Sequence, residues 1–362
     1  MKLFFRFLTF LLIFLVAAEL TLHLKYDRTY PEALGPEFDE YMRTRFLDQI
    51  KETQPQFFLM GDSMLRDSID QAGLRDLTGL TIEYADVPGS GSALWYLILK
   101  NNIALAPNTP QYLVIFFRDT MLTSANFRVD GKYLAMLDEY AGEDEALLLE
   151  RAYIMPMPKL EQFMESYLPM YRTRDDLLEL SGNNFKSFLP FKLLGCSVDC
   201  VDEALKSVFS ADNFDILGLD MEVDAKENSL YDPIDMQFDH QVERSFLPEI
   251  IRLAHEKDMQ LIMVRMKTTR HPTRADASKE LLAYMDDLDA YLATNEIILM
   301  DYAFDERVLD EWFKDAVHIQ RSDRMKFTEI FAQDLLYLLG ANPGLPVDCP
   351  ECKLKHATPQ PE

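Results

Sequence analysis

The stretch Phe57-Phe58-Leu59-Met60-Gly61-Asp62-Ser63-Met64-Leu65 decides the fold. Its apolar run ends at a glycine, an acid and a serine, and a helix-like segment follows. This pattern predicts a buried strand that turns directly into a helix. In open α/β folds such turns lie at the carboxyl edge of a parallel sheet, where ligands and reacting groups gather.

Working outward, strand-like and helix-like segments alternate along much of the chain. Further strands are expected at 80–85, 112–117, 260–264 and 296–300, and helices at 93–104, 246–257, 276–293 and 324–339. This alternation implies a parallel sheet with right-handed crossovers. Because the carboxyl ends of parallel strands share one edge, we expect Ser63, the loop 89–92, Arg118 and the segment 265–274 to converge.

The alternation is interrupted between residues 120 and 237, where Met- and aromatic-rich helical segments predict one long insertion. We therefore expect an α/β domain at 55–340 that contains this insertion. A charged juxtamembrane segment at 25–54 precedes the domain, and a tail at 341–362 follows it.

The N-terminus has the composition of an export or anchor element. Lys2 and Arg6 precede the uncharged run 7–18, and the apolar stretch extends over 3–22 with Arg6 and Glu19 near its ends. That length is in the range of a membrane-spanning helix, so we expect a retained anchor at 1–24. Val16-Ala17-Ala18 leaves cleavage as a signal peptide open. Either way, the leading basic residues place the rest of the chain outside the cytoplasm.

Charge and cysteine content limit the class of protein. The formal net charge of −25 argues against general nucleic-acid binding, and its simplest role is to keep the protein soluble. Four cysteines form two close pairs, which in an oxidising compartment favour local disulfides over one four-thiolate zinc site. The pairs are Cys196 with Cys200 and Cys349 with Cys352.

A serine is a poor nucleophile unless a base accepts its proton and a third group orients that base. Late in the chain, Asp315-Ala316-Val317-His318 offers an acid and an imidazole within one helical turn. Ser63 could instead be an ordinary helix N-cap, and Asp315 and His318 an exposed surface pair.

These blocks together resemble the SGNH (GDSL) hydrolase superfamily. The resemblance rests on Gly61-Asp62-Ser63, a glycine-containing loop after the second strand, and Asp315-Ala316-Val317-His318 before the last helix, and it spans roughly 57–332. It implies a flavodoxin-like three-layer fold with a central parallel sheet. Because no metal-ligand spacing of histidines and acids and no phosphate-binding glycine pattern is found in the sequence, we expect no metal or cofactor. The resemblance also implies Ser63 as nucleophile, His318 as base and Asp315 as the orienting acid.

The same resemblance implies an oxyanion site, and here the chain departs from the family. Backbone N–H groups of Ser63 and of Gly89 or Gly91 would stabilise the oxyanion. The family's asparagine after the third strand is missing, since the chain has Arg118 there. A guanidinium could bind the oxyanion or an anionic acceptor, or it could be a salt-bridged residue in a site that has lost hydrolysis.

A basic segment, Arg265 to Arg274, stands out in so acidic a chain. We expect its cations, Arg270 and His271 among them, to lie near Ser63 with Arg66 and to attract an anionic substrate group. A solvated loop paired with neighbouring acids is the alternative.

With an N-terminal anchor and Arg118 in place of asparagine, the chain resembles the extracytoplasmic partners of membrane-bound O-acyltransferases, of the alginate O-acetylation and teichoic-acid D-alanylation types. The resemblance implies a periplasmic O-acyltransferase on the bacterial inner membrane, with an acetyl group as the expected group transferred. It would act on an envelope or exported polysaccharide beside a polytopic membrane partner. The alternatives are a carbohydrate esterase and a catalytically silent assembly or glycan-binding protein.

Overall fold

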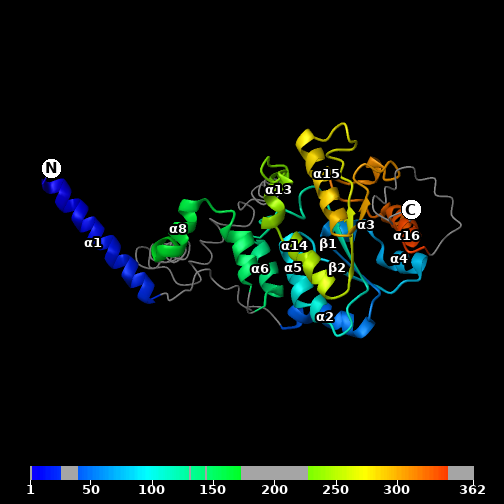
Figure 1. Ribbon diagram of the computed structural model, residues 1–362, viewed down its shortest axis with the longest axis horizontal. Coiled ribbons are helices and arrows are strands. Elements are labelled where there is room, and N and C mark those ends of the chain that lie inside the picture. Colours follow the sequence, from blue (N-terminus) through cyan, green and yellow to red (C-terminus); the bar gives the residue numbers. More distant parts are fainter. Residues whose placement is uncertain (1, 26–39, 130–131, 143–144, 173–226, 341–362) are drawn as a thin grey trace, which may run out of the picture. The chain divides into compact units, whose positions relative to one another are not determined.

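The computed structural model describes residues 2–25, 40–129, 132–142, 145–172 and 227–340 (Figure 1). By their contacts these residues belong to two units. One unit comprises residues 1–33 and 154–227, and the other comprises residues 34–153 and 228–362. Each unit is described by itself below.

The second unit is built on a five-stranded parallel sheet with the order β2-β1-β3-β4-β5. The strands are β1 (Phe57–Gly61), β2 (Ile82–Asp86), β3 (Tyr112–Phe117), β4 (Gln260–Arg265) and β5 (Ile298–Asp301). The α/β class and all five strands predicted from the sequence are confirmed. This order is the flavodoxin-like one, in which the direction of winding reverses beside the first strand.

The central strands are apolar because both of their faces are covered. All five residues of β1 are buried, and Leu113 to Phe117 of β3 are fully inaccessible to solvent. Strands covered on both sides lose the alternation of polar and apolar residues. This burial fixes the carboxyl ends of β1 and β3 side by side.

Two groups of helices cover the sheet, on opposite sides in Figure 1. In one group α2 (Glu40–Thr53) and α14 (Leu247–Glu256) contact α5 (Ser92–Asn101). In the other, α3 (Ser63–Ser68) and α4 (Gln71–Thr78) contact α16 (Arg324–Leu338). A further helix, α15 (Lys279–Thr294), packs on β5.

The described part of the insertion is mostly helical, as the sequence predicts. It contains α6 (Lys132–Tyr140), α7 (Ala146–Leu148), a π-helix (Leu149–Ile154), α8 (Lys159–Tyr167) and α9 (Pro169–Arg172). The short helix α13 (Phe238–Gln241) follows directly after it. The predicted disulfide cysteines, Cys196, Cys200, Cys349 and Cys352, all lie outside the described residues.

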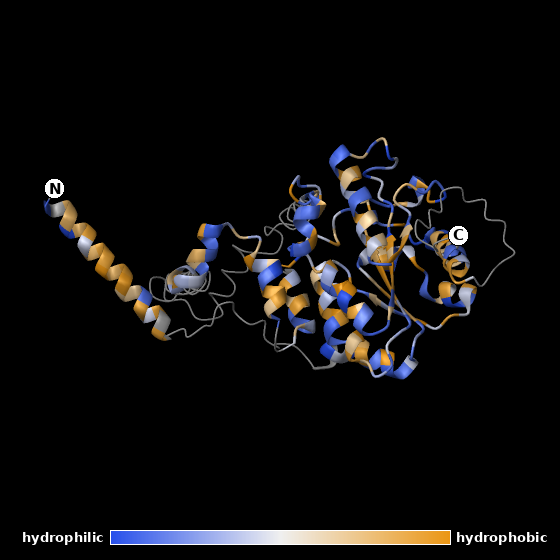
Figure 2. Ribbon diagram, in the orientation of Figure 1, coloured by the Kyte–Doolittle hydropathy of each residue, from blue (hydrophilic) through white to orange (hydrophobic). Residues whose placement is uncertain are grey.

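The first unit contains α1 (Lys2–Lys25), whose apolar side chains are exposed along its length. The stretch Phe4–Leu22 is long and apolar enough to cross a membrane, and Figure 2 shows that α1 is mostly hydrophobic. Among the described residues it is the one helix with these properties. The same unit holds α8 and α9, and α9 contacts α1.

Candidate active site

The turn between β1 and α3 brings Ser63 to the carboxyl edge of the sheet. Gly61 allows α3 to begin at once, because a Cβ on Gly61 would lie only 2.9 Å from the Cβ of Leu65 and 3.1 Å from that of Phe116. Asp62 is the N-cap of α3, and its carboxylate accepts a hydrogen bond of 2.8 Å from the backbone N–H of Met64. Ser63 is the first residue of the helix, so its hydroxyl lies at the rim of the sheet.

Asp315 and His318 lie in a tight loop. The sequence places them within a helical turn, but the structure forms an antiparallel bridge between Phe313 and Ile319 instead. The backbone N–H of Lys314 donates to the carbonyl of His318 over 2.9 Å. The expectation of a helical turn is therefore wrong, because backbone pairing across the loop replaces i to i+4 hydrogen bonds.

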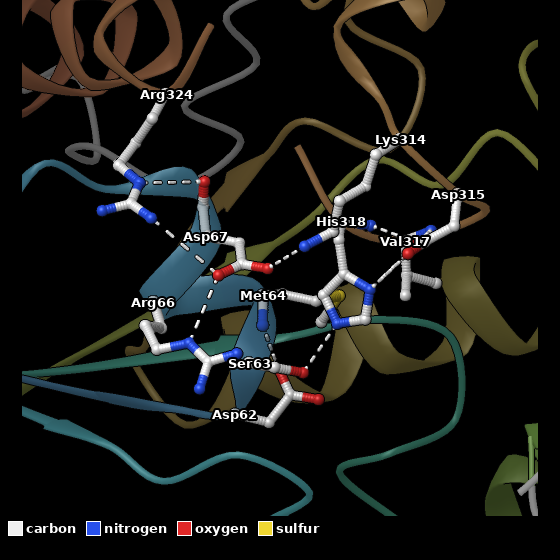
Figure 3. A network of polar contacts seen from close by, with 10 residues as sticks. All are labelled: Asp62, Ser63, Met64, Arg66, Asp67, Lys314, Asp315, Val317, His318 and Arg324. Atoms are coloured by element: carbon white, nitrogen blue, oxygen red, sulfur yellow. Dashed lines mark hydrogen bonds and ion pairs between the residues drawn. The ribbon is translucent and has the colours of Figure 1, made fainter. Parts of the chain in front are cut away.

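The structure brings the three predicted side chains into one line (Figure 3). The Oγ of Ser63 lies 2.8 Å from Nε2 of His318. On the other side of the ring, Nδ1 of His318 lies 2.9 Å from both carboxylate oxygens of Asp315. Serine and aspartate therefore contact opposite nitrogens of one imidazole, although they come from opposite ends of the domain.

Hydrogen bonds keep Asp315 ionised. Burial by itself would raise the pKa of this carboxyl. The backbone N–H groups of Val317 and His318 and the imidazole donate to it, and together they lower its pKa below the ordinary value. The side chain of Asp315 is 47% exposed and that of His318 is 24% exposed, so water has access to the site.

A cluster of ion pairs joins the two segments that carry the triad. Asp67 lies one turn after Ser63 on α3 and is 7% exposed. Its carboxylate accepts hydrogen bonds from Nζ of Lys314 over 2.8 Å and from Nε of Arg66 over 3.2 Å. Nε of Arg324 donates to its backbone carbonyl over 3.3 Å, as Figure 3 shows. Arg66 is thus close to Ser63, as expected, but its charge is directed to Asp67.

The predicted glycine loop is anchored to the end of β1. The carbonyl of Gly61 accepts hydrogen bonds from the backbone N–H of Val87 over 3.1 Å and from Oγ of Ser90 over 3.2 Å. Gly89 has φ +81°, a conformation that favours glycine. Among the described residues, no hydrogen bond uses the backbone N–H of Ser63 or of Gly89. Both N–H groups can therefore donate to a ligand.

A half-buried cation that sequence reasoning missed, Arg128, lies beside this loop. Its Nη1 is 3.7 Å from Oδ2 of Asp62, and it would lie 3.9 Å from a Cβ on Gly89. The rings of Phe127 and Tyr133 hold the guanidinium, with their centroids 4.8 and 5.6 Å from Cζ. Arg128 has φ +55°, which is a strained conformation for arginine.

The second predicted glycine has a packing role. Gly91 is the N-cap of α5 and has an extended φ of −139°. A Cβ at this position would lie 3.1 Å from the backbone carbonyl of Phe127. Gly91 thus lets the segment that carries Arg128 approach the loop closely.

Arg118 is buried at the end of β3, and its Nη1 pairs with Asp119 over 3.0 Å. Asp119 also accepts a hydrogen bond of 2.7 Å from the hydroxyl of Tyr231. This geometry corresponds to the salt-bridged alternative for Arg118.

The cations of the segment 265–274 are also paired, which corresponds to the alternative of a loop bound to neighbouring groups. The pairs are Arg265 with Asp289 and Asp301, Lys267 with Asp310, Arg270 with Asn228 and the ring of Tyr231, and Arg274 with Asp286. His271 packs edge-on against the ring of Tyr231, and its Nδ1 lies 3.3 Å from the carbonyl of Asp276. We therefore do not assign an anion site to this segment.

A cavity of about 510 Å³ opens at the carboxyl ends of β4 and β5. Arg265, Lys267 and Phe304 line it together with several acids, and none of the triad residues does. In the part of the chain that the structure describes, no cluster of three histidine, cysteine or acidic residues could hold a metal ion.

No protein-family model matches this chain, and no curated protein matches it significantly.

The residues of the site indicate what chemistry it could perform. A hydroxyl, an imidazole and an ionised carboxylate in hydrogen-bonding sequence can deprotonate the serine and return the proton to a leaving group. The backbone N–H of Ser63 and that of Gly89, in the loop anchored to the end of β1, could stabilise a developing oxyanion. The arrangement is suited to acyl transfer through a covalent serine ester.

Proposed function

We propose that this chain is a membrane-anchored, extracytoplasmic O-acyltransferase of the SGNH type. The observation that carries the proposal is the 2.8 Å contact between Oγ of Ser63 and Nε2 of His318, with Asp315 behind the ring. The flavodoxin-like strand order and the position of Ser63 after β1 support the family assignment. The apolar helix α1 supports the anchor.

The reaction has two halves, and the proton balances in each. In the first, Oγ of Ser63 attacks the acyl carbon of the donor while its proton moves to Nε2 of His318. The bond from the acyl carbon to the leaving group breaks, and the leaving group takes that proton. In the second, an acceptor hydroxyl gives its proton to His318 and attacks the serine ester, and Ser63 leaves with the proton.

Backbone N–H groups and the carboxylate of Asp315 stabilise the charges that develop in both halves of the reaction. The negative charge on the carbonyl oxygen is stabilised by the N–H groups of Ser63 and Gly89, each worth on the order of 3 kcal/mol in such sites. Asp315 orients the ring so that Nε2 faces Ser63 and stabilises the imidazolium that forms transiently.

The acceptor proposed is a hydroxyl of an envelope or exported polysaccharide, and the group transferred is an acetyl group. A polytopic membrane-bound O-acyltransferase would supply the acyl group. The protein would be anchored in the bacterial inner membrane with its active site in the periplasm. These assignments rest on the resemblance of the sequence blocks together with the anchor helix.

A carbohydrate esterase is the second candidate, and the exposure of Asp315 and His318 favours it. Water reaches the imidazole, so water can replace the acceptor hydroxyl in the second half of the reaction. The two functions share every step up to the serine ester, and they differ only in which hydroxyl compound His318 deprotonates.

One experiment separates the candidates. The purified chain is given p-nitrophenyl acetate with and without a soluble oligosaccharide, and acetylated oligosaccharide and free acetate are both quantified. An acyltransferase forms acetylated oligosaccharide at the expense of acetate, whereas an esterase releases acetate regardless of the acceptor. Ser63→Ala should abolish both products, and Ser322→Ala, at an exposed serine, is the matched control. Unchanged products from Ser63→Ala would refute both candidates, because product formation would not depend on Ser63. Absence of both products with the natural chain would favour a non-catalytic protein.

A further inference from the structure

The helix α8 (Lys159–Tyr167) is amphipathic, but it exposes its apolar face and buries a polar one. This is the opposite of what is usual for a helix of a water-soluble protein. Its large apolar side chains point outward: Leu160 is 69% exposed, Phe163 54% and Tyr167 70%. Positions i, i+3 and i+7 lie on one face of a helix. The exposed residues therefore form a single apolar stripe.

The opposite face of α8 is polar and turned inward. Glu165 is 8% exposed. The side-chain amide of Gln162 donates to the backbone carbonyls of Ile154 and Met157 over 3.0 and 2.8 Å. These hydrogen bonds fix the rotation of the helix, so the apolar stripe cannot turn inward without breaking them.

The apolar stripe is connected to the apolar helix of the same unit. The next helix, α9, contacts α1, and the backbone N–H of Met170 donates to the carboxylate of Glu19 over 2.9 Å. Glu19 lies near the C-terminal end of the apolar stretch Phe4–Leu22. Tyr171 also donates to Glu161 of α8 over 3.4 Å. These contacts hold α8 close to the end of α1.

We propose that the stripe of Leu160, Phe163 and Tyr167 lies in the interfacial layer of the lipid bilayer that α1 spans. The proposal rests on the anchor role proposed for α1 and is independent of the triad. The rings of Phe163 and Tyr167 are tilted against each other with centroids 5.0 Å apart. Aromatic side chains of this kind are enriched where a membrane meets water, because their rings are apolar and the tyrosine hydroxyl remains hydrated.

The charge of α8 indicates what drives this contact. The helix carries Lys159 against Glu161 and Glu165, so it has no excess of cations to attract anionic headgroups. Insertion is therefore driven by apolar burial, and it should not weaken as salt is added. This distinguishes the stripe from a basic helix held on a membrane by charge.

The test places a tryptophan in the stripe of the full-length chain. Phe163→Trp is reconstituted in phosphatidylcholine vesicles with and without bromine atoms on the acyl chains, which quench tryptophan fluorescence on contact. The native residues Trp95 and Trp312 are 0% and 7% exposed and provide a constant background. Phe14→Trp in α1 is the membrane-inserted control, and Tyr337→Trp in α16 is the exposed control outside this unit.

We expect brominated lipid to reduce the added emission of Phe163→Trp about twofold, since interfacial helices bury their apolar face roughly 5–10 Å deep. Raising the salt should leave that quenching unchanged, and Tyr337→Trp should not respond. Quenching of Phe14→Trp without quenching of Phe163→Trp would overturn the inference and leave the anchor intact. Absence of quenching at both positions would overturn the anchor as well. The emission of Phe163→Trp could also be insensitive to brominated lipid and change only when a polytopic membrane protein is added. That result would assign the stripe to a protein partner and would contradict the lipid contact.

Discussion

Among single residues, Arg128 brings positive charge to the turn that carries Ser63, the proposed nucleophile. Its guanidinium lies beside the buried carboxylate of Asp62 and beside Gly89, where we place the oxyanion. Leaving a buried carboxylate unpaired typically costs about 3–5 kcal/mol. Arg128 therefore serves stability through Asp62, and the same positive charge favours negative charge that develops at the loop.

A pair of variants separates these two contributions. Arg128→Met should lower both the free energy of unfolding and kcat for ester cleavage, with the fall in kcat on the order of 100-fold as for other oxyanion donors. The double variant Asp62→Asn, Arg128→Met should regain stability, because asparagine also caps helices and leaves no charge unpaired. Its kcat should stay low. Denaturant unfolding and initial rates are the measurements, and recovery of kcat in the double variant would show that Arg128 only neutralises Asp62.

Sequence reasoning identifies some of these residues and misses others for a physical reason. Ser63, Asp315 and His318 are visible because each stands in a short motif with a fixed position relative to a strand or helix. Arg128 has no motif, and its role depends on how the insertion folds back onto the loop around Gly89. Such a contact is set by tertiary packing, which a local pattern does not encode.

At the scale of elements, the contact between Asp67 and Lys314 holds α3 against the loop that carries Asp315 and His318. Burial by itself would raise the pKa of Asp67, but hydrogen bonds and charges from Lys314 and Arg66 lower it below its ordinary value. A group whose folded-state pKa is lowered stabilises the fold above its unfolded pKa, near 3.9, and loses that contribution as the pH falls through the folded-state pKa.

Asp67→Asn should therefore reduce the free energy of unfolding at pH 7 by about 1 kcal/mol, a value limited by the exposure of Lys314. The difference from the natural protein should begin to shrink as the pH falls below about 4, because the unfolded chain then takes up a proton at Asp67. It disappears only below the lowered folded-state pKa, where both proteins carry a neutral side chain. Thermal unfolding from pH 3 to 8 measures this. Asp76→Asn, at an exposed position on α4, is the control. A difference that grows on acidification would contradict the sign of this argument.

The turn between β1 and α3 depends on the absence of a side chain at Gly61. Gly61→Ala places a Cβ 2.9 Å from that of Leu65 and should cost about 1–3 kcal/mol, as overpacking does in other cores. It should also lower kcat, because α3 and Ser63 must shift. Gly79→Ala adds a Cβ in open space and tests backbone strain alone. If Gly61→Ala costs less stability than Gly79→Ala, close packing does not determine the turn.

The strands were predictable because continuous apolar runs such as Tyr112–Phe117 correspond directly to buried parallel strands. Boundaries were less predictable: β2 was expected at 80–85 and spans Ile82–Asp86. The sequence predicts a helical turn at Asp315 where the structure has a loop, because spacing by three residues brings side chains together in either conformation. The bridge between Phe313 and Ile319 shows that the chain adopts the loop conformation, and no sequence motif predicts this bridge.

For the whole molecule, the consequential feature is α1, which is long and apolar enough to cross a membrane and which we propose as the anchor. The full chain should float with phosphatidylcholine vesicles in a density gradient at both low and high salt, since apolar transfer rather than charge drives insertion. Leu12→Arg, in the middle of the apolar stretch, should weaken this association because a central arginine costs about 3 kcal/mol or more. Leu12→Phe should not. Loss of flotation in high salt would indicate a surface-bound protein instead of a spanning one.

The central claim is that His318 activates Ser63 as a nucleophile. A fluorophosphonate tests this directly: Oγ of Ser63 forms a bond to phosphorus, fluoride leaves, and the hydroxyl proton passes to His318. Mass spectrometry of the digested protein should find one adduct, on the peptide that contains Ser63, and His318→Gln should slow its formation by at least about 100-fold. An unmodified Ser63 in the folded protein, or labelling at the same rate in His318→Gln, would contradict the account.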